Sequence, residues 1–369
     1  MTANEMAAPS QHPAPAAAPG EETGLPRGSA DPLATVYDVA LLDLDGVVYL
    51  GGKAIPGAAD ALAKATHLGM RLAFVTNNAS RSPSAIAAQL TSLGVPATVH
   101  DVVTSAQAAA RLLAQRLPAG APVLVVGGIG LRIALRERRL RPVSTAAEHP
   151  QAVVQGYAPD ISYGLLAEAA MAIRAGAWFV ASNADVTLPS PRGPQPGNGS
   201  LIQVLVTATG RHPVVAGKPE PPLHAEAVQR TGATRPLVVG DRLDTDIEGA
   251  VRGKADSMLV LTGVSQPADA VLAPPGLRPT YLARDLDGLL TGHPEVSRGH
   301  GGFQCGGWTA ELDAEAGQLR LSGSGDPMDG LRALCAAAWS GGKVTPEMAA
   351  SAVQRLGLSP DGSSRPGQG

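Results

Sequence analysis

The sequence predicts an α/β fold built on parallel β-sheets, and two observations support that prediction. Short apolar runs alternate with segments of helical periodicity from Val36 onward, which is the pattern of successive βα units. Several of these runs end in Asp, Asn, Thr or Gly. In an open α/β sheet the carboxyl ends of the strands form the edge where ligands bind, so polar residues there predict a functional site.

The predicted elements follow one another in the order that such a fold requires. Strands are expected at 39–45, 71–75, 122–126, 152–156, 178–182, 213–217, 236–240 and 258–261, because each is a short apolar run. Helices are expected at 57–68, 84–93, 104–117, 131–139, 162–175, 200–209, 220–231 and near 245–252. The alternation then weakens, and the sequence predicts a hairpin within 303–323 followed by helices at 330–339 and 346–356.

Length and composition define the class of protein. At 369 residues and 44% hydrophobic content, the chain is expected to form two or three packed units. The 29 basic and 32 acidic residues leave a net charge of −3, which disfavours nucleic acid or a membrane as a partner.

Cys305 and Cys335 lack the spacing of a zinc site or a disulfide framework. Without a transmembrane-length apolar stretch or a signal-peptide pattern, a soluble cytoplasmic protein is expected.

The N-terminal part of the chain differs from the rest. Residues 1–36 are rich in Ala and Pro and contain almost no bulky apolar side chain. Such a segment buries too little apolar surface to offset the entropy of ordering it. We therefore expect residues 1–36 to form a disordered tail.

The strongest candidate site is the run Asp43-Leu44-Asp45-Gly46 at the end of the first strand. Two carboxylates two residues apart can converge on one ligand, and Gly46 permits the sharp turn between them. The alternative is a strand-end turn with two solvated aspartates. This run alone does not decide between the two interpretations.

A second acidic cluster follows another apolar strand. Asp241, Asp244 and Asp246 lie within the run GDRLDTD. Oxygen-only ligands of this kind suit Mg²⁺, and two acidic clusters at the same edge of a sheet favour a divalent-cation site. The alternative for this run is that Asp244 or Thr245 caps the next helix.

Two further motifs suit a phosphate group. Thr76, Asn77 and Asn78 end a strand, where hydroxyl, amide and main-chain N–H groups at a helix entrance form an anion cradle. Lys218 also follows a strand and would supply a fixed cation beside the carboxylates. Helix capping is the alternative for the first motif, and a solvated surface charge is the alternative for Lys218.

These motifs resemble those of the haloacid dehalogenase (HAD) superfamily. In chain order, and each at a strand end, they are Asp43-x-Asp45, Thr76, Lys218 and Gly240-Asp241-x₄-Asp246. The wording DLDGVVY, VTNNAS, GKP and GDRLDTDI is similar to subfamily IIA, which includes p-nitrophenylphosphatase-like, pyridoxal-phosphate and glycerol-phosphate phosphatases. The runs VVTSAQ, AIRAGA, PGNGSL and VVGDRLDTDIEGA resemble those of bacterial glycerol-3-phosphate phosphatases.

The resemblance implies a Mg²⁺-dependent phosphomonoesterase. Asp43 would attack phosphorus to form an aspartyl-phosphate, while Asp45 would protonate the leaving alkoxide and then activate water. Lys218 would offset the repulsion between a carboxylate and a phosphate dianion. The implied phosphate-binding residues are Thr76, Asn77, Asn78 and Lys218. The implied Mg²⁺ ligands are Asp43, Asp45 through its main-chain carbonyl, Asp241, and Asp246 directly or through water.

The resemblance also implies a core that is interrupted by an inserted domain. Between Asn78 and Lys218 lie 139 residues, far more than a βαβ crossover needs. In subfamily IIA such an insertion is an α/β cap of the C2 type, which would cover the site and select the leaving group. The chain is expected to divide into a tail at 1–36, a Rossmann-like core at 37–108 and 212–290, a cap at 109–211, and a small C-terminal extension at 291–369.

Specificity is expected in the cap loop 183–189, where Asp185 and Thr187 are the candidate substrate-binding residues. Each of them also fits ordinary loop punctuation by polar residues and Pro. Leu188 stands where the pyridoxal-phosphate phosphatases are expected to carry His. This departure disfavours pyridoxal phosphate as the substrate.

The expected substrate is therefore a small phosphorylated metabolite, with glycerol 3-phosphate favoured. Other small phosphate esters are alternatives within the same enzyme class: p-nitrophenyl phosphate, phosphoglycolate, pyridoxal phosphate and nucleoside monophosphates. A third hypothesis treats the chain as a phosphatase-like scaffold whose C-terminal segment is a binding or regulatory module. A homodimer formed through the cap is the expected self-association.

Overall fold

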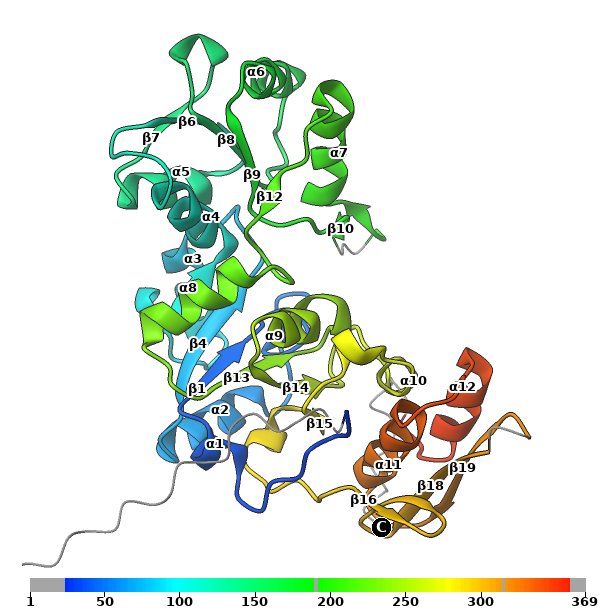
Figure 1. Cartoon of the computed structure of the whole chain (residues 1–369). Coiled ribbons are helices and arrows are strands. Elements are labelled where there is room, and N and C mark those ends of the chain that lie inside the picture. The colour runs from blue at the N-terminus through cyan, green and yellow to red at the C-terminus, as the bar shows by residue number, and fades with distance from the viewer. Residues whose placement is uncertain (1–23, 189–191, 314–315, 359–369) are drawn as a thin grey trace, which may run out of the picture.

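The computed structural model describes residues 24–188, 192–313 and 316–358, which form three packed bodies (Figure 1). A central body carries the larger parallel sheet. A second body, in cyan and green, lies above it, and a third, in orange and red, lies to one side. The two parallel sheets confirm the predicted α/β class.

The central body, or core, contains a six-stranded parallel sheet with the order β15-β14-β13-β1-β4-β5. Its strands are β1 (Val39–Leu42), β4 (Arg71–Thr76), β5 (Val102–Thr104), β13 (Pro236–Gly240), β14 (Asp256–Val260) and β15 (Tyr281–Ala283). Strand β1 pairs with β13 on one side and β4 on the other. Segments that precede and follow the insertion therefore build one continuous sheet.

The central strands are buried on both faces, as expected for a parallel sheet. Leu42 and Phe74 join one apolar cluster, whereas their neighbours Leu41 and Val75 join another on the opposite face. The helices of the core are α1 (Leu33–Val36), α2 (Ala58–His67), α3 (Pro83–Ser92), α4 (Ser105–Ala114), α8 (Pro221–Thr231), α9 (Glu248–Arg252) and α10 (Pro267–Val271). A short antiparallel pair, β2 (Tyr49–Leu50) and β3 (Lys53–Ala54), follows β1.

The second body, from β6 to β12, is the cap, and it contains a five-stranded parallel sheet with the order β12-β9-β8-β6-β7. Its strands are β6 (Pro122–Val126), β7 (Arg141–Val143), β8 (Ala152–Gln155), β9 (Trp178–Ala181) and β12 (Val214–Val215). Its helices are α5 (Ile129–Glu137), α6 (Tyr163–Arg174) and α7 (Asn198–Thr209), with a hairpin of β10 (Thr187–Leu188) and β11 (Gln195–Pro196).

Strand β12 shifts the boundary of the cap. It pairs with β9, so the cap sheet continues beyond residue 211, where the insertion was expected to end. Residues 213–217 were expected to belong to the core. An apolar run predicts a strand, but it does not show which of two sheets the strand joins.

The cap and the core share apolar packing. Val39 and Val75 of the core sheet belong to the same buried cluster as Val123 and Leu131 of the cap. Helix α4 packs against α5 of the cap and against α8 of the core. Burial of this shared surface stabilises the docked arrangement of the two bodies.

The N-terminal segment corrects one expectation. Residues 1–23 lie outside the described residues, whereas residues 24–36 pack on the core. Leu33 is fully buried, and Arg27 forms an ion pair with Asp256 at 2.7 Å. The prediction of a disordered tail is therefore wrong for 24–36, because a few apolar residues suffice where the folded core supplies the complementary surface.

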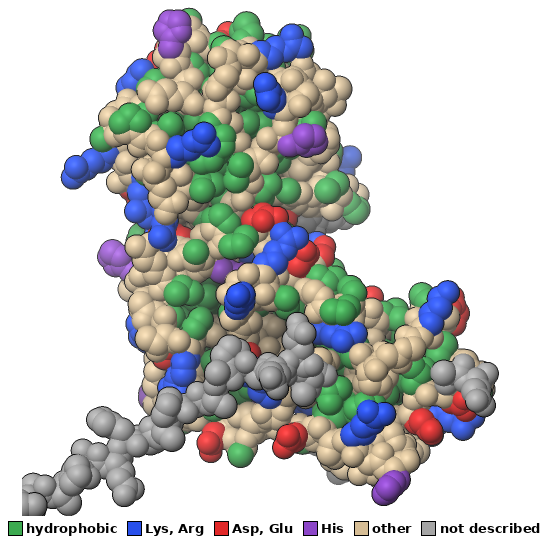
Figure 2. Space-filling view, viewed as in Figure 1, with side chains coloured by type: hydrophobic (Ala, Val, Ile, Leu, Met, Phe, Trp, Pro, Cys, Tyr) green, Lys and Arg blue, Asp and Glu red, His purple; other side chains and the backbone are tan. Residues whose placement is uncertain are grey.

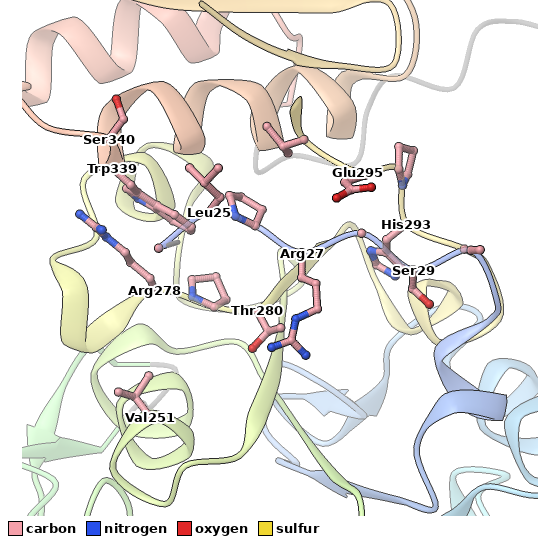
Figure 3. Close-up of a pocket in the computed structure, with 18 of the residues that line it drawn as sticks. Leu25, Arg27, Ser29, Val251, Arg278, Thr280, His293, Glu295, Trp339 and Ser340 are labelled. Carbon is pink, nitrogen blue, oxygen red and sulfur yellow. The ribbon is translucent and has the colours of Figure 1, made fainter. Parts of the chain in front are cut away.

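This segment also lines a groove of about 1320 Å³ between the core and the third body (Figure 3). The Arg278 guanidinium on the core side lies over the ring of Trp339 in the third body, 5.3 Å from its centroid. Leu25 and Arg27 of the segment lie in the same groove. The N-terminal segment thus runs beside the junction of the core and the third body.

The third body is the extension, and it combines a four-stranded antiparallel sheet with two helices. The strands are β16 (Ser297–Gly299), β17 (Gly302–Cys305), β18 (Trp308–Asp313) and β19 (Gln318–Gly323), and the helices are α11 (Pro327–Trp339) and α12 (Pro346–Gln354). The predicted hairpin and both predicted helices are confirmed. Arg332 of α11 donates a hydrogen bond to the carbonyl of Leu282 in β15 at 2.7 Å, which ties the extension to the core.

In residues 24–188, 192–313 and 316–358, no helix has both the length and the apolar character that crossing a membrane requires.

Candidate active site

Three predicted site residues meet at the carboxyl edge of the core sheet. Asp43 follows β1, Thr76 is the last residue of β4, and Asp241 follows β13. Strand β1 lies between β4 and β13, so residues far apart in the sequence become neighbours. The edge therefore gathers the motifs as the parallel topology predicts.

Three carboxylates form the centre of the site. Asp43, Asp241 and Asp246 offer oxygens that all lie within 4.8 Å of one another. Asp246 comes from the π-helical turn Leu243–Ile247 that follows β13. Asp241 and Asp246 are each only 1% exposed. Carboxylates this close and this buried repel one another unless cations lie among them.

Lys218 supplies one cation. Its ammonium group forms ion pairs with Asp43 and, at 2.8 Å, with Asp246 Oδ1, and it donates a hydrogen bond to the carbonyl of Val75 at 3.1 Å. The lysine is buried, so solvent screens these contacts little. One ammonium among three carboxylates leaves uncompensated negative charge.

The donor set fits a divalent cation such as Mg²⁺. Asp241 Oδ2 accepts a hydrogen bond from the main-chain N–H of Val264 at 2.7 Å. The other oxygen, Oδ1, is buried and accepts no hydrogen bond from the described part of the chain. A buried carboxylate oxygen without a partner, beside two further acids, matches the hard oxygen ligands that Mg²⁺ prefers.

Two glycines allow the main chain to approach these acids closely. Gly46 has a φ of 84°, and a Cβ atom added there would collide with the Asp241 carboxylate. A Cβ at Gly263 would collide with the same carboxylate. Glycine is therefore required at position 46 for two reasons: it permits the predicted turn, and it leaves the space that the Asp241 carboxylate occupies.

Burial and mutual repulsion shift the titration of the site. Burial raises the pKa of the Asp43 carboxyl. The positive charge of Lys218 opposes this shift, whereas the negative charges of Asp246 and Asp241 reinforce it. Burial, together with Asp246, raises the pKa of Asp241 to about 6. Burial by itself would lower the pKa of Lys218, but Asp246 and Asp43 turn the net shift upward. A bound divalent cation favours the charged carboxylates and counteracts their upward shifts.

Asp45 lies at the mouth of the site, outside the carboxylate cluster. Its side chain reaches solvent, yet the protein around it desolvates the carboxyl enough to raise its pKa, against the opposing charges of Lys218 and Arg81. A carboxyl with a raised pKa keeps its proton at higher pH, which suits a proton donor. Asp244, the third acid of its motif, instead pairs with Arg242 at 2.8 Å on the surface.

The structure divides the predicted phosphate cradle. Thr76 is buried at the end of β4, and its hydroxyl accepts a hydrogen bond from the N–H of Asn78 at 3.1 Å. Asn78 is exposed, and its own Oδ1 accepts hydrogen bonds two residues further on, which forms a local Asx turn. The carboxamide of Asn77 bonds to the main chain of Lys218 and to Asp185. The Asn77 amide and the Asn78 Oδ1 thus have partners within the protein, and the contact of either residue with a phosphoryl oxygen stays a prediction.

The two predicted cap residues have different surroundings. Asp185 reaches the core and accepts a hydrogen bond from Asn77 Nδ2 at 3.1 Å. Thr187 begins β10 and is exposed. Figure 2 shows charged side chains of both signs gathered at the waist between the cap and the core.

Two further residues shape this waist: Asn183, which lies in the predicted specificity loop 183–189 without a role of its own, and Arg242, which was not predicted. Asn183 donates a hydrogen bond to the carbonyl of Asn77 at 2.8 Å, and Arg242 lies close enough to Asp185 to oppose the burial that raises its pKa. Both residues follow predicted strands. Their position at strand ends was a usable signal, but it does not separate groups that support the main chain from groups that bind a ligand.

Family models match two parts of the chain, the core with the first part of the cap, and the extension. A family model described as haloacid dehalogenase-like hydrolase matches residues 40–141, and a second HAD-hydrolase-like model matches residues 215–289. A third model, described as a GCN5-related N-acetyltransferase like domain, matches residues 305–358. The extension therefore has a family likeness of its own, different from that of the core.

Relatives over most of the chain agree with the core assignment. D-glycerol 3-phosphate phosphatase of Mycobacterium tuberculosis is 52% identical over 257 residues, covering 70% of this chain and 72% of that protein. An acid sugar phosphatase of Staphylococcus saprophyticus is 36% identical, covering 69% of this chain and 97% of its own length. The crystal structure of a glycerol phosphate phosphatase from M. tuberculosis in complex with magnesium matches with a TM-score of 0.80 at 44% identity, over 89% of this chain and 100% of that one. The chain belongs to the haloacid dehalogenase-like hydrolase family.

Proposed function

We propose that this protein is a Mg²⁺-dependent phosphomonoesterase that hydrolyses glycerol 3-phosphate to glycerol and phosphate. The observation that carries the proposal is the group of Asp43, Lys218, Asp241 and Asp246 at one edge of the core sheet, in which all but the partly exposed Asp43 are buried. Such a group matches the charge demands of phosphoryl transfer. The similarity to the M. tuberculosis D-glycerol 3-phosphate phosphatase supports the choice of substrate.

Asp43 is the proposed nucleophile. Its carboxylate oxygen attacks phosphorus, forming an O–P bond while the bond between phosphorus and the glycerol oxygen breaks. Asp45 donates a proton to the departing alkoxide. In the second step Asp45 takes a proton from water, the water oxygen attacks phosphorus, and the Asp43–phosphorus bond breaks to release inorganic phosphate.

Asp43, Asp241 and the main-chain carbonyl of Asp45 are the proposed Mg²⁺ ligands, with Asp246 beside them. Bound Mg²⁺ supplies the positive charge that offsets the repulsion between an attacking carboxylate and a phosphate dianion. Lys218 adds to this charge balance and holds the Asp43 carboxylate by their ion pair. The Thr76 hydroxyl is the side-chain donor proposed for a phosphoryl oxygen.

A small polar leaving group fits the composition of the chain. Aromatic residues make up 3% of the sequence, which leaves few rings to stack a base or a pyridine. In the cap, Asp185 and Thr187 are proposed to contact leaving-group hydroxyls. The acid sugar phosphatases among the relatives favour a small sugar phosphate as the second candidate substrate.

The activity is tested by measuring phosphate release from a substrate panel with Mg²⁺ and with EDTA. We expect glycerol 3-phosphate to be cleaved faster than pyridoxal phosphate, phosphoglycolate or UMP, and EDTA to stop the reaction. Equal slow rates on every substrate would contradict the assignment of glycerol 3-phosphate. Full activity in EDTA would contradict the role of Mg²⁺.

We also propose a cytoplasmic homodimer formed through the cap. Cys305 and Cys335 are both buried and free of disulfides, which suits a reducing compartment. Met171 and Val204 are about half exposed on the cap helices α6 and α7, at 50% and 47%, and among the described residues β12 is an edge strand of the cap sheet. Light scattering tests the assembly, and a monomeric mass at every concentration would contradict it.

A further inference from the structure

The side chain of Asn77 connects the catalytic centre to the cap. Its Oδ1 accepts a hydrogen bond from the main-chain N–H of Lys218 at 2.8 Å, and its Nδ2 donates to the carbonyl of the same lysine at 3.1 Å. The same Nδ2 lies 3.1 and 3.3 Å from the two carboxylate oxygens of Asp185. One carboxamide thus holds both main-chain polar groups of the catalytic lysine and one acid of the cap.

Lys218 needs support at this point because of its place in the chain. It lies between β12, the last strand of the cap, and α8, a helix of the core. A shift of this connecting segment would move its ammonium group away from Asp43. A Cβ atom at the preceding Gly217 would lie 2.5 Å from Asn77 Oδ1, so the absence of a side chain there permits the close approach.

The cap side of the contact is also held in place. Asn183 Nδ2 donates to the carbonyl of Asn77 at 2.8 Å, and its Oδ1 accepts from the N–H of Asp185 at 3.2 Å. The carbonyl of Asp185 accepts from the N–H of Gly199, in the first turn of α7, at 2.8 Å. Side chains held by such secondary contacts are positioned before a substrate binds.

The charge of Asp185 makes the hydrogen bond from Asn77 important. Burial raises the pKa of Asp185, and the Asn77 hydrogen bond opposes that shift. A partly desolvated carboxylate gains more from a hydrogen-bond donor than an exposed one does. The contact therefore stabilises the cap loop and Asn77 together.

We propose that Asn77 is a positioning residue through which Asp185 of the cap holds Lys218 in the catalytic centre. With Asp185 in place, the Asn77 amide is fixed from the cap side and in turn fixes the N–H and carbonyl groups of Lys218. Without Asp185 the amide keeps only its two hydrogen bonds to the Lys218 main chain, and the lysine loses the support that comes from the cap. The inference rests on the proposed phosphatase activity and adds a second role for Asp185, besides contact with the leaving group.

The two roles of Asp185 lead to different kinetics. If Asp185 only contacts leaving-group hydroxyls, its loss affects hydrolysis of glycerol 3-phosphate, chiefly through KM, and leaves hydrolysis of p-nitrophenyl phosphate unaffected. Positioning of Lys218 lowers kcat for both substrates, since both transfer the same phosphoryl group. The split between kcat and KM on the two substrates therefore separates the roles.

A double-mutant cycle tests the inference. Asn77→Ala, Asp185→Ala and the double variant are measured with Mg²⁺ on glycerol 3-phosphate and on p-nitrophenyl phosphate. We expect each single variant to lower kcat on both substrates by roughly tenfold to a hundredfold, as misplaced catalytic groups do. The double variant is expected to lose no more than Asn77→Ala alone.

Two further variants make the cycle specific. Asp185→Asn keeps an oxygen that can accept from Asn77 Nδ2, and we expect it to retain most of the kcat that Asp185→Ala loses. Glu137→Ala removes an exposed acid from α5 of the cap and is the matched control, expected to leave kcat unchanged. If Asn77→Ala does not fold, as judged by circular dichroism, the comparison of Asp185→Ala with Asp185→Asn still decides.

Three results would overturn the inference: multiplied losses in the double variant, a loss confined to glycerol 3-phosphate, or equal losses in Asp185→Asn and Asp185→Ala. A wild-type protein that cleaves no phosphate ester would instead contradict the proposed function itself. The two failures are therefore distinguishable, because the inference is judged only by variants of an active enzyme.

Discussion

The carboxyl edges of the two parallel sheets share an architecture but differ in chemistry. At the core edge, the residues that follow the strands, Asp43 and Asp241, are acids. At the cap edge, β8 ends at Gln155, and Ser182 and Asn183 follow β9, all three neutral. Asp241 and the three cap residues are nearly inaccessible to solvent, so exposure does not explain the difference.

The cost of burial explains what each edge can do. Buried carboxylates are destabilising unless cations or hydrogen bonds compensate them, so a cluster such as that of the core is retained for binding charged groups. Neutral amides can instead fix the main chain at little electrostatic cost. Asn183 holds the carbonyl of Asn77, and Asn198 holds the carbonyl of Asn183 at 2.7 Å. The core edge therefore suits the binding of charged groups, and the cap edge suits support of the main chain.

The largest effect on this difference between the two edges is expected from neutralising the proposed nucleophile at the core edge. Asp43→Asn replaces a charged oxygen with an amide that does not attack phosphorus, and we expect kcat to fall by about a thousandfold or more. Phosphate release from glycerol 3-phosphate measures the effect, with thermal unfolding as the control for folding. A variant that keeps a tenth of the wild-type kcat would show that another group is the nucleophile.

The next effect concerns the buried cation. Lys218→Met keeps a side chain of similar length without the charge, and we expect kcat to fall roughly a hundredfold or more through the loss of charge stabilisation. In EDTA the variant is expected to be about 3 kcal/mol less stable, because it leaves buried carboxylates uncompensated. Urea unfolding measures this loss. Unchanged stability would mean that the three acids are not charged together in the folded protein.

Metal removal should produce a smaller, pH-dependent effect on stability. The pKa of Asp241 is raised to about 6 in the fold, so in EDTA the native state binds the extra proton. The free energy of unfolding should then decrease as pH rises from about 4, the unfolded value, through the folded value. Mg²⁺ offsets this loss because it favours the charged carboxylate.

Thermal unfolding with Mg²⁺ and with EDTA between pH 5 and pH 7.5 tests this linkage. We expect the Mg²⁺-induced rise in Tm to be larger at the higher pH. Asp241→Asn is the control, since it removes one of the titrating carboxyl groups and should weaken the dependence. A Tm difference that is the same at both ends of the range would contradict the expected linkage.

The smallest expected effect is at the cap edge. Both polar atoms of the Gln155 side chain are buried without a hydrogen-bond partner among the described residues. Gln155→Leu replaces this amide with an apolar group of similar size, and we expect the stability to change by less than about 1 kcal/mol or to increase, with kcat unchanged. Urea unfolding and phosphate release measure the two quantities. A loss well above that value would mean that the amide is hydrogen-bonded in solution, for instance to buried water.

The sequence allowed the core edge to be predicted because its signals are local. An apolar run followed by Asp marks both a strand and its functional end, as at Asp43 and Asp241. Parallel topology then brings such ends together without further information. The same local reasoning predicted Lys218, whose contacts with Asp43 and Asp246 confirm that it is no solvated surface charge.

Elements without a strong local pattern could not be predicted in this way. The strands β5, β7 and β15 are each three residues long, too short for periodicity to distinguish them from loops. Strand β12 was predicted as a strand but assigned to the wrong sheet. Residues 24–36 were predicted to be disordered, because their packing depends on a surface that distant parts of the chain build.

The sequence by itself determined the fold class, the two acidic clusters and the position of Lys218, since each can be recognised from the local pattern of consecutive residues. Only the tertiary structure decided the use of Asn77, whose carboxamide holds the Lys218 main chain and contacts Asp185. An asparagine at a strand end serves equally well as a ligand, a cap or a support. Which of these it becomes depends on the groups that folding brings within hydrogen-bond distance of its amide.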